Sequence, residues 1–119
     1  HFILLIIYIY FINIRMFKLV KIEKLNNDKK KYQAIFQNIE TEKIKKTKFG
    51  ASGYSDYTIH KDKERRNNYI QRHKKDLKTK EYTKPGYLSM FILWNKPTLK
   101  ASIADYKKRI KNNDWSIPN

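Results

Sequence analysis

The sequence contains no cysteine, only three glycines and three prolines, and few acidic residues for its length. Without cysteine there is no disulfide framework and no thiolate metal site, which is compatible with a reducing, intracellular location. Only 11 Asp and Glu stand against 27 Lys and Arg, so the 119 residues carry a formal net charge of +16. A chain of this length fits one domain, and a domain this basic attracts nucleic acid, anionic membranes or acidic proteins.

Codon bias is a second explanation for the lysines. Lys, Asn, Ile, Tyr and Phe have A/T-rich codons and are all abundant here, as an A/T-rich genome would make them. Such a bias does not by itself lower the content of Asp and Glu. We therefore favour a polyanionic partner and keep codon bias as the alternative. A hydrophobic content of 40% argues against wholesale disorder.

The first fifteen residues differ from the rest of the chain. Residues 2–14 read FILLIIYIYFINI, apolar except for Asn13, and Arg15 and Met16 follow. A membrane-spanning helix needs about 17–25 apolar residues, and a signal peptide begins with a basic region that is missing here. We interpret residues 1–15 as upstream sequence translated ahead of a start at Met16, with a truncated apolar anchor as the alternative. Residues 16–119 are then a single basic domain, and we expect no membrane contact.

The first half of this domain reads as strands. Residues 17–25, 32–38 and 42–49 form three segments, and the second alternates Tyr32, Ala34 and Phe36 with other residues, the period of a half-buried strand. In the first segment Val20 and Ile22 are expected on one face. The lysine-rich third segment suits a sheet edge, where charge discourages aggregation. The three segments predict an antiparallel meander.

Helical patterns follow a glycine-containing boundary at residues 50–53. Asp62 is a suitable N-cap for a helix over residues 63–74, and Thr98 for one over residues 99–111. Residues 87–95 (YLSMFILWN) predict a short buried helix, in which Phe91 and Trp94 belong to the core. Residues 75–84 read as a connection. The fold class is therefore α+β, a three-stranded antiparallel meander followed by about three helices.

Glycines and small residues follow the third strand. Gly50, Ser52 and Gly53, next to Lys48, are a candidate phosphate loop whose backbone N–H groups are exposed. The segment matches neither a P-loop nor the GxGxxG pattern. We favour the simpler interpretation of a strand-to-helix turn with positive φ at Gly50 or Gly53.

The chemistry of a metal-dependent nuclease would need Asp56, His60 and either Asp62 or Glu64 to converge. No HExxH or HxH spacing is present, and Asp62 and Glu64 would point to different faces of a helix. We expect no catalytic residues, no metal, no cofactor and no small-molecule substrate.

The basic residues offer contacts to phosphates that carry no sequence readout. Tyr54, Tyr57 and Tyr82 could stack on bases. A merely solvated face is the alternative. The nucleic-acid contacts that we expect are Lys45, Lys46, Lys48, Lys61, Lys63, Arg65, Arg66, Arg72, Lys74 and Lys75.

Two blocks, residues 48–73 and 87–109, carry a family resemblance. With the phrases SDYTIHKD and ILWNKPTLKASIADYKKR, they resemble a family of short uncharacterised proteins of giant nucleocytoplasmic DNA viruses. The resemblance implies a viral protein acting in the infected cell or virion, and it assigns no activity. We therefore expect a non-enzymatic, virus-encoded protein that binds nucleic acid or another polyanion. The alternative is a minor virion or assembly protein with an exposed apolar patch near residues 87–94; a nuclease is less favoured.

Overall fold

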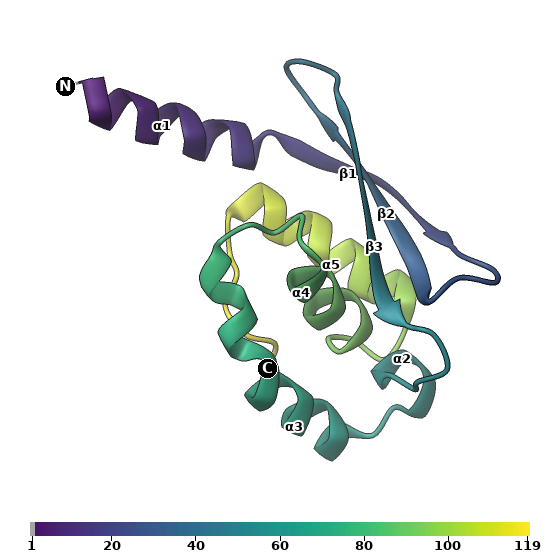
Figure 1. Cartoon of the computed structure of the whole chain (residues 1–119). Helices are drawn as coiled ribbons and strands as arrows, with labels where there is room; N and C mark the ends of the chain where they lie inside the picture. Colours follow the sequence, from purple (N-terminus) through teal and green to yellow (C-terminus); the bar gives the residue numbers. More distant parts are fainter. Residues whose placement is uncertain (1) are drawn as a thin grey trace.

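The computed structural model describes residues 2–119, and the side chains of all of these except residues 9–15. Strands β1 (Phe17–Lys24), β2 (Lys30–Asn38) and β3 (Ile44–Ala51) form an antiparallel sheet in the order β1-β2-β3 (Figure 1). Helices follow the sheet along the chain, so the predicted α+β class is confirmed. The lysine-rich β3 lies at an edge, as its composition predicts.

A β-bulge changes the face that β1 buries. Leu19 lies opposite Phe36 and Lys21 opposite Ile35, so Val20 has no partner across the ladder. Such an extra residue reverses the alternation of side chains. Leu19 is therefore buried and Val20 is 43% exposed, while Ile22 packs against the core. The expectation that Val20 and Ile22 share a face is wrong for this reason.

The helical half begins with α2 (Tyr57–His60), α3 (Lys63–His73) and the 3-10 helix η1 (Lys74–Thr79). Asp62 caps α3, because its Oδ1 accepts hydrogen bonds from the backbone N–H groups of Glu64 and Arg65 at 2.9 and 3.2 Å. This prediction is confirmed. Residues 75–84 are a simple connection only in part, since η1 occupies the first half of that segment.

The core is built around the segment of α4 (Pro85–Leu88) and the π-helical η2 (Ser89–Leu93). Figure 1 shows it between the sheet and the surrounding helices. Met90, Phe91 and Ile92 are fully buried, so the apolar run is the buried helix that its composition predicts. Helix α5 (Leu99–Asn112) packs against it, with its N-cap on Thr98 as expected.

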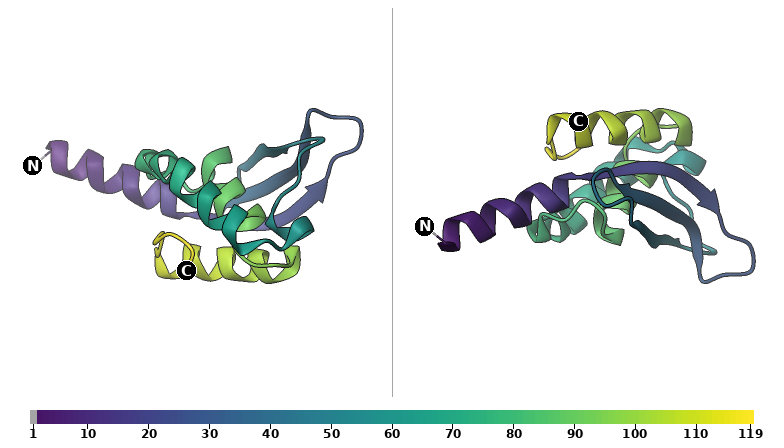
Figure 2. Two further views of the ribbon diagram at one scale, coloured as in Figure 1. Left: turned by 90° about the horizontal axis from the view of Figure 1, so that it is seen from below. Right: turned by 90° about the horizontal axis from the view of Figure 1, so that it is seen from above.

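Helix α1 (Phe2–Arg15) precedes β1 and projects away from the body, on the side opposite the β1–β2 turn (Figures 1 and 2). Its described side chains are exposed, from 45% at Ile7 to 77% at Phe2. In the part of the chain that the structure describes, every helix is too short or too polar to cross a membrane. The interpretation of residues 1–15 as upstream sequence stays a prediction.

Candidate functional site

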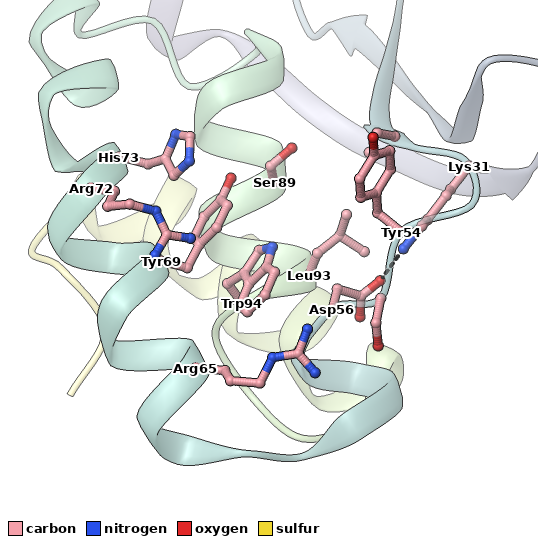
Figure 3. A pocket seen from close by; sticks show the side chains of 13 residues that line it. Lys31, Tyr54, Asp56, Arg65, Tyr69, Arg72, His73, Ser89, Leu93 and Trp94 are labelled. Carbon is pink, nitrogen blue, oxygen red and sulfur yellow. Dashed lines mark hydrogen bonds and ion pairs between the residues drawn. The ribbon is translucent and has the colours of Figure 1, made fainter.

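A cavity of about 360 Å³ opens between α3, the start of β2, the end of β3, the loop before α2, and η2. We call it the α3 cavity. Figure 3 shows that α3 contributes one wall, that Tyr54 and Asp56 stand on the loop opposite, and that Leu93 and Trp94 lie between them. The cavity thus joins elements from both halves of the fold.

Two glycines let the chain turn from β3 into this loop. Gly50 has φ +78° and Gly53 has φ +85°, which confirms the predicted turn. A Cβ at Gly50 would also lie 2.8 Å from Cδ1 of Leu93, whereas one at Gly53 would meet nothing within 4 Å. Gly50 is therefore required both by the backbone conformation and by the close packing of β3 against η2.

The candidate phosphate loop does not gather its donors around the cavity. The Ser52 N–H donates to the Lys29 carbonyl oxygen at 2.9 Å, and its hydroxyl donates to the Asp28 carbonyl oxygen at 2.8 Å. Both donors of Ser52 are thus used to tie β3 to the turn before β2. Of the three predicted loop residues, only Gly50 lines the α3 cavity.

Asp56 fixes the loop on the far side of the cavity. The carboxylate is almost fully buried and its Oδ2 accepts a hydrogen bond from Lys31 Nζ at 2.7 Å. Its Oδ1 accepts hydrogen bonds from the N–H and the hydroxyl of Thr58. Asp56 is thereby the N-cap of α2. The Lys31–Asp56 pair therefore holds β2 to the loop and adds little net charge to the cavity.

The residues of the nuclease hypothesis do not assemble. His60 Nδ1 accepts a hydrogen bond from the Asp62 N–H at 2.9 Å, and Asp62 caps α3. Among residues 2–119, apart from the side chains of residues 9–15, no three His, Asp or Glu side chains are grouped closely enough to hold a metal ion. The geometry lends the nuclease hypothesis no support.

Stacked rings form the α3 wall of the cavity. Tyr69 lies between Trp94 and His73, with centroid distances of 4.2 Å to each and interplanar angles of 3° and 24°. Burial raises the pKa of Tyr69 to about 12, so the phenol stays neutral at physiological pH. Across the cavity Tyr54 is 74% exposed.

The charged groups of this wall are Arg65 and Arg72. They stand seven residues apart on α3, about two turns, so they lie on one side of the helix and both line the cavity (Figure 3). Within the described part of the chain, neither guanidinium takes part in a hydrogen bond or an ion pair. The cavity therefore carries two uncompensated positive charges beside an aromatic wall.

Arg66, predicted as a phosphate contact, is instead a structural residue. Its side chain is buried at 6% exposure; Nε donates to the Asn95 carbonyl oxygen at 2.9 Å and Nη2 to a main-chain oxygen of Asn119 at 2.6 Å. The prediction fails because position 66 lies four residues before the buried Ile70, on the inner face of α3. The spacing of four residues between Arg66 and Ile70 is the feature of the sequence that could have predicted its burial.

Four of the predicted lysines already have partners inside the protein. Lys48 pairs with Asp28 at 2.7 Å, and Lys61 donates to the Pro97 carbonyl oxygen at 2.6 Å. Lys45 donates to the Thr83 hydroxyl at 2.8 Å, and Lys74 to Gln71 Oε1 at 3.1 Å. The predicted residues whose charged groups have no hydrogen bond or ion pair to any described residue are Lys46, Lys63, Arg65, Arg72 and Lys75.

The predicted contacts also lie on more than one surface. In the β2–β3 ladder Lys45 pairs with the buried Phe36, so it shares the helix-facing side of the sheet. Successive side chains of a strand point to opposite sides, so Lys46 and Lys48 lie on the outer side of the sheet, and Phe49 lies on the same side as Lys45. The cations predicted on β3 and on α3 therefore do not form a single continuous surface.

Of the three tyrosines predicted to stack on bases, two are in the interior. Tyr57 is 5% and Tyr82 is 3% exposed, and the Tyr82 hydroxyl donates to the Phe17 carbonyl oxygen at 2.7 Å. Tyr54 alone keeps an exposed ring. Sequence reasoning missed the cavity itself, including Lys31, Tyr69 and Ser89, because these residues converge only through the fold.

Comparison with known families places a domain over part of the chain. Residues 20–73 match a family of unknown function (DUF5754). The match runs from β1 to the end of α3, so it contains the resembling block at residues 48–73 and most of the cavity lining, and it leaves out residues 87–109. No curated protein and no solved structure matches the chain.

Proposed function

We propose that the protein is a non-enzymatic nucleic-acid-binding protein that contacts phosphates with the exposed cations of α3. The observation that carries this proposal is the pair of uncompensated guanidiniums, Arg65 and Arg72, on one side of the helix at the mouth of the α3 cavity. Arginine presents a fork of donors that matches two phosphate oxygens, which is why such groups favour phosphate over a simple halide ion.

The acidic residues strengthen the proposal because many are used inside the protein. Asp28, Asp56, Glu81 and Asp105 each form an ion pair with a lysine or arginine, and Asp62 caps α3. Helix α3 itself contains a single acid, Glu64. The field near α3 is therefore positive, and contacts of this kind bind phosphate without reading sequence.

The proposal includes a viral origin and action in the infected cell or virion. Its support is the resemblance of residues 48–73 and 87–109 to short proteins of giant DNA viruses. The domain family that matches residues 20–73 has no known function, so it adds no activity to this assignment.

A second candidate is a virion or assembly protein that binds other proteins. The apolar surface expected near residues 87–94 is instead core, where only Trp94 and Ser89 keep partial exposure. The observation that now favours this candidate is the exposed apolar face of α1, from Phe2 to Tyr8. Binding of nucleic acid would separate the two candidates.

The test is fluorescence anisotropy of labelled nucleic acid at increasing salt. Each phosphate contact contributes a slope of about −0.9 for duplex DNA in log K against log salt. Replacing both Arg65 and Arg72 by alanine is expected to reduce the steepness by about 1.8 and to weaken binding. The matched control removes the same charge from α5, with Lys107→Ala and Lys108→Ala, and is expected to keep the steeper slope. Micromolar protein that fails to bind at about 50 mM salt contradicts the proposal.

A further inference from the structure

We infer that the α3 cavity receives one unpaired nucleotide, so that the protein binds single strands in preference to duplexes. This inference rests on the proposed function and assigns a ligand class to its central site. It joins three features of the cavity: its size, its aromatic lining and the positions of its charges.

The size of the cavity suits a single small unit. Ligand pockets usually measure about 300–1,000 Å³, and the α3 cavity, at about 360 Å³, lies at the lower end. It lies between α3 and the loop before α2, and its volume is too small to take a stretch of double helix. A base can enter it only after leaving its stack.

The lining offers a surface for a base. Leu93 and Trp94 supply apolar area between the two walls, and Tyr54 stands opposite α3 with a largely exposed ring (Figure 3). Both faces of Tyr69 are covered by its stacked neighbours, so Tyr54 is the tyrosine of the lining whose ring is available for stacking. Stacking of a base on an aromatic side chain contributes about 1–3 kcal/mol and tolerates any base.

The charges stand where a strand would need them. Arg65 and Arg72 are separated by about 10 Å along the axis of α3, so each can meet the phosphate on one side of an inserted nucleotide. The one buried carboxylate of the cavity, Asp56, is neutralised by Lys31 at 2.7 Å and does not repel the phosphates. Simple phosphate binding would need no aromatic surface beside the guanidiniums.

The experiment compares a labelled single strand with a duplex of the same sequence, using the full chain. Tyr54→Ala removes the exposed ring and no charge, and its exposure predicts an unchanged fold. It is expected to weaken single-strand binding about tenfold, as stacking of this strength implies, and to leave duplex binding unchanged. Val20→Ala is the control, because Val20 is 43% exposed on β1 and does not line the cavity. It is expected to change neither affinity.

Competition identifies the occupant. We expect a mononucleotide to compete weakly with the labelled single strand, and inorganic phosphate or an uncharged nucleoside to compete more weakly still. This order supports a site for one nucleotide of a strand. A mononucleotide that binds as tightly as the strand assigns the cavity to free nucleotides and overturns the inference. Equal binding of single strand and duplex, unaffected by Tyr54→Ala, also overturns it while the proposed function stands. Absence of binding to both nucleic acids removes the proposed function as well.

Discussion

Replacing Arg66 by alanine removes a buried guanidinium that joins α3 to two distant segments. Its Nε donates to the Asn95 carbonyl oxygen at 2.9 Å and its Nη2 to an Asn119 main-chain oxygen at 2.6 Å. The guanidinium carbon also lies 5.5 Å from the centroid of the Tyr57 ring. Arg66 neighbours Arg65 in the sequence, yet the two side chains have different surroundings, so this pair separates a structural role from a binding role.

The loss of stability in Arg66→Ala can be estimated from the interactions that the guanidinium makes. A buried carbonyl that loses its partner costs about 1–3 kcal/mol, and a cation–π contact contributes about 1 kcal/mol. Removing the guanidinium also relieves its own desolvation, and this burial is what lowers the pKa of Arg66. Together these effects predict that Arg66→Ala lowers the free energy of unfolding by about 3 kcal/mol. Arg65→Ala is expected to stay within about 0.5 kcal/mol.

Urea denaturation followed by circular dichroism measures both variants. With a slope near 2 kcal/mol per molar urea, Arg66→Ala should lower the midpoint by about 1.5 M. Arg66→Lys retains the charge without the fork of donors and is expected to recover less than half of the loss. Equal midpoints for Arg66→Ala and Arg65→Ala would refute the structural role of Arg66.

Two further predictions concern the loop after β3 and His60, the last residue of α2. Gly50→Ala combines positive φ with a Cβ only 2.8 Å from Cδ1 of Leu93, so it should lower the free energy of unfolding by about 3 kcal/mol. Gly53→Ala, with open space around it, should lower it by about 1 kcal/mol. Equal urea midpoints for the two variants would contradict the close packing at Gly50. Burial lowers the pKa of His60 below 6.5, so the folded state binds fewer protons than the unfolded one and stability is lost as pH falls through about 6.5. Urea midpoints between pH 8 and pH 5.5 should show this loss, and His60→Gln should reduce it; an equal loss in both proteins would show that His60 is not its source.

Local chemistry in the sequence accounts for much of the fold. Strand alternation predicts the meander, and the side chains of Asp62 and Thr98 predict where two helices begin, because capping depends on neighbours within three residues. The bulge at Val20 was not predictable in this way, since it depends on the register between two strands.

The site was less predictable than the fold. Arg65 and Arg72 were among the expected contacts, but the cavity that they line depends on side chains brought together from β2, α3 and η2. A count of lysines also does not show which ones have partners; Lys48 meets Asp28 across twenty residues of sequence. Long-range contacts of this kind decide which cations remain available.

The most direct measurement of the central claim is an NMR titration that follows the arginine Nε–H signals while single-stranded DNA is added. The guanidiniums of Arg65 and Arg72 have no hydrogen bond or ion pair to a described residue, whereas Arg66 and Arg109 donate from Nε to the Asn95 carbonyl oxygen and to Asp105 Oδ2. The account predicts that the signals of Arg65 and Arg72 shift as the strand binds, and that those of Arg66 and Arg109 stay in place. Binding that leaves the Arg65 and Arg72 signals unchanged would contradict it.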